Sequence, residues 1–378
     1  MIYLDNGATS FPKLRGMVRA MEECLLTYCG NPGRSGHYMS MRTGEEVYKV
    51  RKQIGSLIGA RNPERIIFTK NTTEALNLGL KGVVKGGDHV ITSSMEHNSV
   101  LRPLKALEKK GVSHSIIRAG TDGTVNPLDV EKAIRPNTRL IVITAASNVT
   151  GTKMPLAELA GIARKRGILF MVDGAQGVGN MMLDVNKIGI DIFAAPGHKG
   201  LLGPQGTGFL YVRPNLELEF LTEGGTGTDS KSRLQPKDFP DGYEAGTINS
   251  PSIIGLGVGT SFVEKIGPEV IGIFEEELIT YLEEDLYNMN FIRVYGPKPK
   301  KKTGITLFNM DGVGPEELTD TLGKEYGIAV RGGFHCAGLA HKTIGTWNSG
   351  AVRVSVGPFN RKKDMKYLVD ALWKIYRN

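Results

Sequence analysis

Short apolar runs alternate with amphipathic stretches from about residue 65 to about residue 212. In chain order the runs are RIIFT, DHVITS, SHSIIR, RLIVIT, ILFMVD, DIFAA and GFLYV. This alternation predicts a largely parallel sheet wrapped by helices, and several runs are almost wholly apolar, as expected for strands that helices cover on both faces. Because open sheets of this kind bind ligands beyond the carboxyl ends of their strands, we expect functional residues just after these runs.

The pattern changes from about residue 250. A long helical stretch through GTSFVEK and IFEEELITYLEEDL leads into strands near 291–295, 303–308, 328–331 and 351–355, and KDMKYLVDALWKIY spaces its apolar residues like one face of a helix. The chain is therefore predicted to be an α/β protein. Its large domain, residues 16–250, is expected to hold a mostly parallel seven-stranded sheet, and residues 251–378 are expected to form a smaller C-terminal α+β domain, against which residues 1–15 pack.

The composition is that of an ordinary soluble globular protein, with 40% hydrophobic and 23% charged residues among 378. No run of about 18 uncharged apolar residues occurs, and MIYLDNGATS does not look like an export signal, so we expect a cytoplasmic protein without a membrane span. Three cysteines are too few for a disulfide framework, and none has the spacing of a zinc site. A cysteine that matters is therefore expected to act as a thiol, without a bound metal.

The net charge of +8 fits nucleic acid, but anionic cofactors, anionic substrates or simple solubility explain it equally well. The densest basic run, PKPKKK, contains prolines and lies between two strand-like segments. Such a run is typical of a solvated loop, so nucleic-acid binding is not expected.

Chemistry-bearing residues follow two of the apolar runs. ILFMVDGAQ ends a predicted strand in Asp173 and Gln176, and the next strand runs into PGHKG, which places Lys199 between glycines that allow close approach of a ligand. Alone, such an aspartate is more often a turn-former and such a lysine a surface charge. Together they meet the needs of pyridoxal phosphate, which takes a lysine for its Schiff base and an acid for its pyridinium nitrogen. The carboxylate of Asp173 would raise the proton affinity of that nitrogen.

A phosphate cradle is predicted after RIIFT, where KNTTEALNLGL begins a helix. Asn71 and Glu74 have the spacing of a capping box, and the free N–H groups and dipole of a helix start favour an anion. Thr72 and Thr73 would add hydroxyl donors. Taken alone, the segment reads equally well as a bare helix cap.

Two further polar residues follow predicted strands. His97, after DHVITS, has a flat imidazole suited to stack on a cofactor ring and to relay protons, although an isolated histidine is more often structural. Asn148, after RLIVIT, is expected to hydrogen-bond the ring oxygen of the cofactor or the substrate.

The segments YLDNGATS, FTKNTTEALNL, MEHNSV, SNVTGT, VDGAQG, GHKGLLGPQGTGFLY and YEAGT occur in an order that resembles class V aminotransferase-type proteins, and within them the group II cysteine desulfurases and selenocysteine lyases. Each segment is weak alone, but the ordered set is highly specific and runs from Tyr3 through nearly the whole chain. The resemblance implies a pyridoxal-phosphate-dependent transferase of fold type I, active as a homodimer with shared sites.

The resemblance also implies a role for each matching residue. Lys199 would form the Schiff base, Asp173 would pair with the pyridine nitrogen, Gln176 would bind the phenolic oxygen, and His97 would stack on the ring. The residues that would hold the phosphate are Thr72, Thr73, His198 and, from the partner subunit, the residue equivalent to Thr247. This chain has Gly197 where the family often has serine, so one phosphate hydroxyl is missing.

The segment RGGFHCAGL, residues 331–339, resembles the nucleophile segment of the group II desulfurases and places Cys336 at the nucleophile position, with Phe334 where the family usually has histidine. The alternative interpretation of Cys336 is a small apolar residue that only fills space in the core. Arg353 matches the arginine that grips the substrate carboxylate, since a guanidinium pairs with carboxylate in a bidentate way. Arg331 is expected to assist it or to orient the loop. His37 in GRSGHYMS matches a family active-site histidine.

The activity implied is conversion of L-cysteine to L-alanine, with the sulfur transferred to Cys336 as a persulfide and then passed to an acceptor protein or thiol. His97 is the candidate proton donor or acceptor. The alternatives are a selenocysteine lyase, which uses the same residues on L-selenocysteine, and a class V aminotransferase in which Cys336 is incidental. From another class, a non-catalytic nucleic-acid-binding protein is the alternative. Cys24 and Cys29 lie outside any nucleophile motif, and we expect them to pack in the core.

Overall fold

A computed structural model describes residues 1–33 and 35–377 of the chain. Its centre is a seven-stranded sheet with the order β2-β8-β7-β6-β5-β3-β4. The strands are β2 (Ile66–Thr69), β3 (His89–Ser93), β4 (Ser113–Ile117), β5 (Thr138–Thr144), β6 (Leu169–Asp173), β7 (Ile192–Pro196) and β8 (Gly208–Val212). Every neighbouring pair is parallel except those made by β8, which runs antiparallel to β2 and β7. The predicted mostly parallel sheet is thereby confirmed.

Both faces of this sheet are buried, which explains why its strands are almost wholly apolar. Along β5, Leu140 and Val142 belong to one core cluster, whereas Ile141 and Ile143 belong to another on the opposite face, as the two-residue period of a strand requires. The first face is covered by α3 (Thr72–Val83) and α4 (Asn98–Glu108). On the opposite face lie α5 (Pro127–Lys132), α6 (Leu156–Lys165) and α7 (Val185–Ile188).

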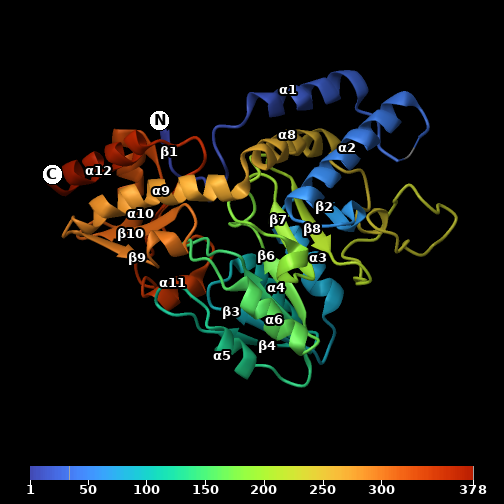
Figure 1. Cartoon of the computed structure of the whole chain (residues 1–378), viewed down its shortest axis with the longest axis horizontal. Coiled ribbons are helices and arrows are strands. Elements are labelled where there is room, and N and C mark those ends of the chain that lie inside the picture. The colour runs from blue at the N-terminus through green and yellow to red at the C-terminus, as the bar shows by residue number, and fades with distance from the viewer. Residues whose placement is uncertain (34, 378) are drawn as a thin grey trace.

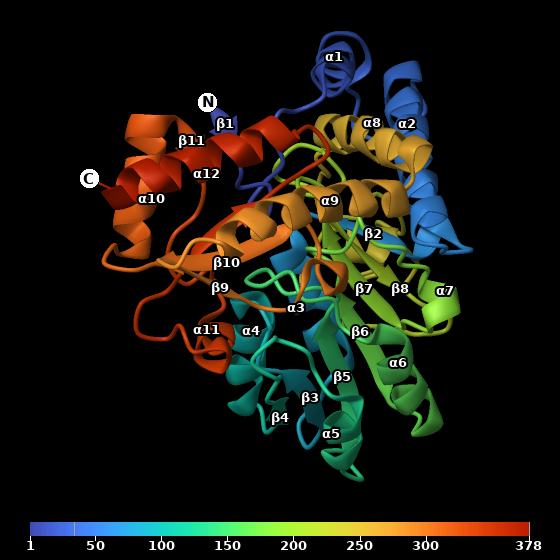
Figure 2. The same ribbon diagram turned by 60° about the vertical axis from the view of Figure 1, so that its left-hand side comes forward.

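Helices from distant parts of the sequence extend that second face. These helices are α1 (Arg15–Glu23), α2 (Tyr38–Leu57) and α8 (Ser250–Ile266). Helix α1 continues directly into a short π-helix, η1 (Cys24–Tyr28). Figures 1 and 2 both show α8 beside α1 and α2. Cys24 is buried here against Tyr28 and Ile254, as expected, but Cys29 is exposed, so the expectation that both cysteines pack in the core holds for Cys24 alone.

A second unit is built on a three-stranded antiparallel sheet, β12-β10-β9, formed by β9 (Ile292–Tyr295), β10 (Ile305–Met310) and β12 (Val352–Ser355). Its helices are α9 (Pro268–Tyr287), α10 (Pro315–Tyr326) and α12 (Lys362–Arg377), and α11 (Gly338–Ile344) follows the predicted nucleophile segment. The N-terminal strand β1 (Ile2–Tyr3) pairs with β11 (Ile328–Ala329). Leu4 lies in the core of this unit, and the packing of residues 1–15 as a whole against the small domain stays a prediction. Single-turn 3₁₀ helices complete the chain at Pro63–Arg65, Asp241–Tyr243 and Pro299–Lys301.

The long helical stretch predicted after residue 250 is two helices. Gly267 has a φ of 93° and Pro268 follows it, so the chain leaves α8 through a conformation that a residue with a side chain rarely adopts and restarts at a helix-compatible proline. Leu256 and Val263 of α8 pack in the core of the large sheet. The domain boundary after residue 250 stays a prediction, and this packing favours placing it at Gly267.

The basic run PKPKKK is a solvated loop only in part. Lys302 is 1% exposed and pairs with the carboxylate of Glu283, which also accepts a hydrogen bond of 2.7 Å from the hydroxyl of Thr306. Burial lowers the pKa of Lys302, and the nearby Glu283 counteracts it. The last lysine of the run therefore anchors the loop to α9 and β10. Over the described residues, no helix combines the length and apolarity that crossing a membrane takes.

Candidate active site

The carboxyl ends of the parallel strands bring the predicted site residues to one edge of the large sheet. Asp173 is the last residue of β6, and Lys199 follows the neighbouring strand β7. Asn148 follows β5 on the other side of β6, and His97 follows β3, the next strand along. The order of strands therefore places these four side chains in one row, as the sequence pattern predicted.

Lys199 and Asp173 influence each other electrostatically. Burial, reinforced by the positive charge of Arg353, lowers the pKa of Lys199 to about 8, and Asp173 opposes this shift. Burial also raises the pKa of Asp173. Two effects act in the opposite direction and lower it: the hydrogen bond of 2.9 Å from the N–H of Ala175 and the positive charge of Lys199. A lysine whose pKa is near neutrality has an appreciable fraction of free amine, which is the form that attacks a carbonyl.

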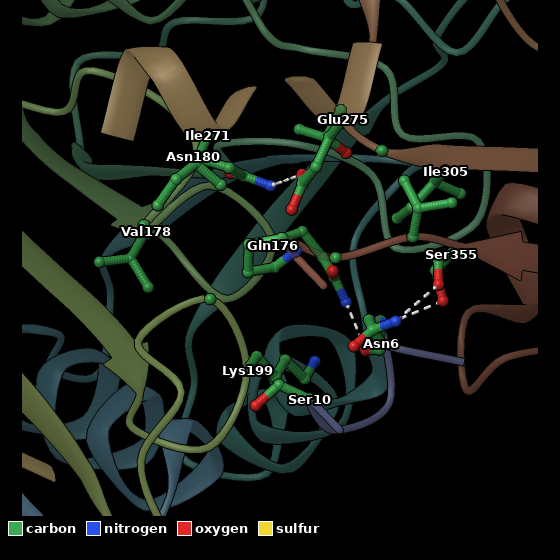
Figure 3. A pocket seen from close by; sticks show the side chains of 18 of the residues that line it. Asn6, Ser10, Gln176, Val178, Asn180, Lys199, Ile271, Glu275, Ile305 and Ser355 are labelled. Carbon is green, nitrogen blue, oxygen red and sulfur yellow. Dashed lines mark hydrogen bonds between the residues drawn. The ribbon is translucent and has the colours of Figure 1, made fainter. Parts of the chain in front are cut away.

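Lys199 also lines a small, partly open cavity of about 40 Å³ with Gln176. Figure 3 shows Lys199 and Ser10 at one end of it, Glu275 and Asn180 at the other, and Gln176 between them. Gln176 donates from Nε2 to the carbonyl of Gly7 at 2.9 Å, which ties the loop after β6 to the N-terminal segment. This volume has room for waters but is far below the roughly 300 Å³ or more of a small-molecule pocket, so the cavity adjoins the lysine and is too small to hold a cofactor.

The glycines around Lys199 serve packing within the protein, which differs from the expectation that they allow close approach of a ligand. A Cβ on Gly197 would overlap the hydroxyl of Thr207, and a Cβ on Gly200 would overlap the carbonyl of Val178. This explains why serine, the common family residue, is absent at position 197: the Thr207 hydroxyl already fills that place.

Three residues from the N-terminal segment hold the backbone beside Lys199, and none of them was predicted as a site residue. The carbonyl of His198 accepts hydrogen bonds from the side chains of Thr9 at 3.1 Å, Ser10 at 3.0 Å and Lys13 at 2.9 Å. Burial lowers the pKa of Lys13 to about 8. These contacts link positions nearly two hundred residues apart, so only the folded chain reveals them.

The start of α3 has the predicted anion-binding features. Asn71 caps the helix, since its Oδ1 accepts the N–H of Glu74 at 2.9 Å, while the Glu74 carboxylate takes the N–H of Lys70 at 2.6 Å instead of closing a full capping box. The N–H groups of Thr72 and Thr73, at the first two helical positions, therefore remain available to a ligand. Beside Lys199 in the chain, Nδ1 of His198 is buried and has no hydrogen-bond partner within the described residues.

His97 is held in one tautomer. Its Nδ1 accepts the backbone N–H of Ser99 at 3.1 Å and also contacts the Ser99 hydroxyl at 2.7 Å, which in turn lies 2.9 Å from the hydroxyl of Thr73. Burial, together with the charge of Lys199, lowers the pKa of His97 to about 4. The ring is thus neutral near pH 7 and carries its proton on Nε2, so this N–H can be donated.

Arg353 is buried, 1% exposed, and is only partly paired. Its Nη2 contacts the carboxylate of Asp5 at 2.7 Å and its Nη1 donates to the carbonyl of Asn148 at 2.9 Å, but its Nε has no partner within the described chain. Burying a guanidinium with an unpaired N–H is costly unless a ligand completes its hydrogen bonds. A substrate carboxylate is the natural acceptor for it.

The segment 331–349 forms a turn followed by α11 and brings Cys336 to the same edge as His97. Cys336 is exposed and lines an open hollow of about 420 Å³ with His97 and Thr73. Nη2 of Arg331 lies 3.7 Å from its sulfur, so the arginine faces the thiol as well as the site. Asn148 donates from its side-chain amide to the carbonyl of His335 at 2.7 Å, and its expected contact with the cofactor or substrate stays a prediction.

Two predicted site residues lie apart from this group. His37 is the N-cap of α2, where its Nδ1 accepts the N–H of Ser40 at 3.3 Å, and its side chain is exposed. Thr247 is exposed and accepts a weak hydrogen bond of 3.4 Å from Asn31. Neither has a described contact with Lys199 or Cys336, so their roles in a site stay predictions.

Glu96, the neighbour of His97, was not predicted as a site residue. It is fully buried and accepts hydrogen bonds through Oε1 from Ser93 and from the N–H of Thr144, while its Oε2 has no partner in the described chain. Burial raises the pKa of Glu96 to about 8, and the nearby Asp173 adds to the effect. The carboxyl is therefore mostly protonated at neutral pH, and its proximity to Asp173 was invisible in a sequence where 77 positions separate them.

The raised pKa of Glu96 predicts a pH dependence of stability. Since the folded pKa is about 8 and the ordinary value 4.5, folding takes up a proton between these pH values, and the carboxyl destabilises the fold increasingly as pH rises through that window. We expect Glu96→Gln to match the parent at pH 5 and to be more stable by roughly 3 kcal/mol at pH 8, measured by urea unfolding of matched cofactor-free samples. The exposed Glu277→Gln serves as the control. A stability difference that does not change with pH would contradict the buried, protonated state.

Known proteins share this architecture and sequence. A family model described as aminotransferase class-V matches residues 2–368. A protein named probable cysteine desulfurase from Methanothermobacter thermautotrophicus is 35% identical over 99% of this chain and 94% of its own, and a cysteine desulfurase from Salmonella agona is 35% identical over 100% and 94%. The apo structure of a cysteine desulfurase from Thermococcus onnurineus superposes with a TM-score of 0.93 at 33% identity, over 100% of this chain and 94% of that one. The chain therefore belongs to the class V aminotransferase family.

Proposed function

We propose that this protein is a pyridoxal-phosphate-dependent cysteine desulfurase, which converts L-cysteine to L-alanine and transfers the sulfur to Cys336. One observation carries the proposal: Cys336 and His97 line the same open hollow, and His97 lies within the electrostatic reach of Lys199. An exposed thiol and a lysine with a lowered pKa thus flank one imidazole. An aminotransferase needs the lysine, but it has no use for the thiol.

The residues present suit pyridoxal phosphate. The unpartnered Nδ1 of His198 and the free N–H groups at the start of α3 would hold its phosphate, and the buried carboxyl of Asp173 would face its ring nitrogen. Lys199 would bind its aldehyde carbon. Bound there, the cofactor supplies an electron sink for the bonds at the substrate's α-carbon.

The chain's own residues then divide the remaining work. The unpaired Nε–H of Arg353 binds the substrate carboxylate and orients the amino acid. Lys199, near half-protonated at pH 8, removes the proton from the α-carbon. The Cys336 thiolate forms a bond to the substrate sulfur while the bond between that sulfur and the substrate β-carbon breaks, and the β-carbon ends as the methyl group of alanine after gaining a proton. The ammonium that Lys199 becomes on taking the α-proton can supply this proton, and the neutral ring of His97 offers a hydrogen-bond donor at Nε2 beside it.

Three further features belong to the proposal. The enzyme would act as a homodimer in which Thr247 reaches the phosphate of the partner's site, in keeping with its exposure away from its own Lys199. A thiol-bearing acceptor protein would remove the sulfur from exposed Cys336, and the reaction would take place in the cytoplasm. Each can be tested by solution methods, beginning with the mass of the particle.

The deciding experiment is an end-product assay. Purified protein with pyridoxal phosphate is incubated with L-cysteine or L-selenocysteine and a reducing thiol, and alanine and released chalcogen are measured. We expect equimolar alanine and sulfide from L-cysteine. Alanine from L-selenocysteine alone would make the protein a selenocysteine lyase, and a keto-acid product with no sulfide would make it an aminotransferase. A colourless protein that binds nucleic acid would contradict an enzymatic role.

A further inference from the structure

The backbone of the nucleophile segment has an uncommon conformation. His335 has a φ of 52° and Cys336 a φ of 57°, so two consecutive residues with side chains lie in the left-handed region. Such residues are rare there because Cβ crowds the following carbonyl, and two in succession persist only when surrounding contacts hold them. The question is which contacts do so.

Two buried histidines provide the answer. His335 is 2% exposed, and its Nε2 lies 3.0 Å from the carbonyl oxygen of Arg331. Its Nδ1 lies 3.1 Å from Nε2 of His341, which is fully buried, and the two rings stack with centroids 5.3 Å apart. Nδ1 of His341 lies 2.7 Å from the hydroxyl of Thr346. All four ring nitrogens therefore have a partner inside the protein.

The chemistry of these partners fixes the direction of every hydrogen bond. A carbonyl only accepts, so Nε2 of His335 must carry a proton and Nδ1 of a neutral His335 must accept. His341 must then donate from Nε2 and accept at Nδ1, which leaves the Thr346 hydroxyl as a donor. The chain runs from Thr346 through His341 and His335 to Arg331, with one proton per bond. A further proton on Nδ1 of His335 would set two N–H groups against each other, and one on Nδ1 of His341 would force the Thr346 hydroxyl to turn and accept.

The chain of hydrogen bonds closes the turn that carries the thiol. It fixes the carbonyl of Arg331, which also accepts the backbone N–H of Arg353 at 2.8 Å. In the other direction, the N–H of Arg331 donates to the carbonyl of Arg353 at 3.2 Å. The same turn is held from outside, because Asn148 donates to the carbonyl of His335 at 2.7 Å and the N–H of Asn98 donates to the carbonyl of Cys336 at 2.9 Å. Cys336, the guanidinium of Arg331 and Arg353 are thus fixed relative to one another.

Phe334 covers this arrangement from the solvent side. Its ring meets His341 edge-on, with centroids 5.3 Å apart, and Trp347 at 6.1 Å. The departure from the usual family histidine at position 334 therefore accompanies a second histidine further along, at 341, which donates a hydrogen bond to His335 in the interior. Apolar cover keeps water from competing for the buried N–H groups.

We propose that His335 and His341 are positioning residues, which hold Cys336 in its left-handed conformation with the side chain of Arg331 against its sulfur. Neither ring has a described contact with the sulfur, and the hydrogen-bond chain ends on a carbonyl that cannot be protonated at ordinary pH, so the pair does not transfer protons to substrate. The consequence for sulfur transfer rests on the proposed function, whereas the ordering of the segment does not.

The test replaces His341 in two ways. In His341→Leu the size is kept and the donor is lost, and in His341→Gln the amide nitrogen takes the place of Nε2. In the leucine variant we expect amide hydrogen exchange of residues 331–337 to accelerate about tenfold or more, because one buried hydrogen bond is lost. In the glutamine variant the exchange rate should stay within about threefold of the parent. Exchange in α6 reports on overall folding, and Thr346→Val, which removes only the outer donor, is a milder second variant if the leucine variant does not fold.

The holoenzyme gives a second measurement. We expect His341→Leu to lower kcat for L-cysteine about tenfold with KM within about twofold of the parent, because substrate binding depends on Arg353 and Lys199, and the glutamine variant to recover most of kcat. Parent-like exchange in the leucine variant, or equal acceleration in both His341 variants, would overturn the proposal. If exchange accelerates in His341→Leu but the parent enzyme forms no alanine, the positioning role stands and only the desulfurase function is rejected.

Discussion

Cys336→Ala is expected to lower alanine formation from L-cysteine by about 10²-fold or more, the size expected for loss of a group that acts directly on the reacting atoms. Without the thiolate nothing in the described site accepts the substrate sulfur, because the other polar residues that line the hollow with His97 offer hydroxyl, amide or cationic groups and no second thiol; they include Thr73, Asn98, Ser99, Lys81 and Arg102. Binding of cofactor and substrate depends on other residues, so the KM for L-cysteine should change little.

Two comparisons make the Cys336 result specific. Cys29→Ala removes the other exposed thiol, which lies beyond η1 and away from the sheet edge, and should leave turnover unchanged. On L-selenocysteine, whose carbon–selenium bond is weaker, Cys336→Ala should retain a larger share of parental activity than on L-cysteine. Undiminished desulfuration of L-cysteine by Cys336→Ala would refute the assignment of the nucleophile.

The fold was largely predictable because its strongest signal is local. Runs such as RLIVIT are apolar on both faces, and β5 indeed places Ile141 and Val142 in cores on opposite sides of the sheet. The break at Gly267 was missed, because one glycine followed by proline fits both a helix end and a new helix start. The burial of Lys302 was also missed, since its partner Glu283 belongs to another helix and no local pattern announces the pair.

The site was predictable where a residue directly follows a strand, as Asp173 and Lys199 do, because parallel strands converge at their carboxyl ends. What the sequence could not reveal are the groups that support these residues from elsewhere in the chain. Lys13 supports the carbonyl of His198, and His341 supports His335, through contacts that exist only once the chain has folded. The Thr207 hydroxyl beside Gly197 is of the same kind: it explains a departure from the family pattern that the sequence could only register.

Lys199→Ala is expected to abolish both of the lysine's roles at once. Alanine formation from L-cysteine should fall by about 10³-fold or more, since covalent attachment of the cofactor and proton transfer at the α-carbon are lost together. The visible absorbance of the lysine-linked cofactor should disappear on mixing with pyridoxal phosphate, while the phosphate contacts at α3 and His198 still retain the free cofactor. Both effects are measured on the same sample, by absorbance and by alanine assay.

The matched control for this substitution is Lys187→Ala, an exposed lysine whose only described ion pair is with Asp184 at 3.4 Å on the protein surface, where such pairs contribute little. Because the pKa of Lys199 is lowered to about 8 by burial and by Arg353, a small added amine with a similar pKa should partly restore turnover to Lys199→Ala and not to Cys336→Ala. That difference separates the proton-transferring amine from the sulfur-accepting thiol. A Lys199→Ala enzyme that keeps its absorbance band and its turnover would place the cofactor on another lysine and refute the site as described.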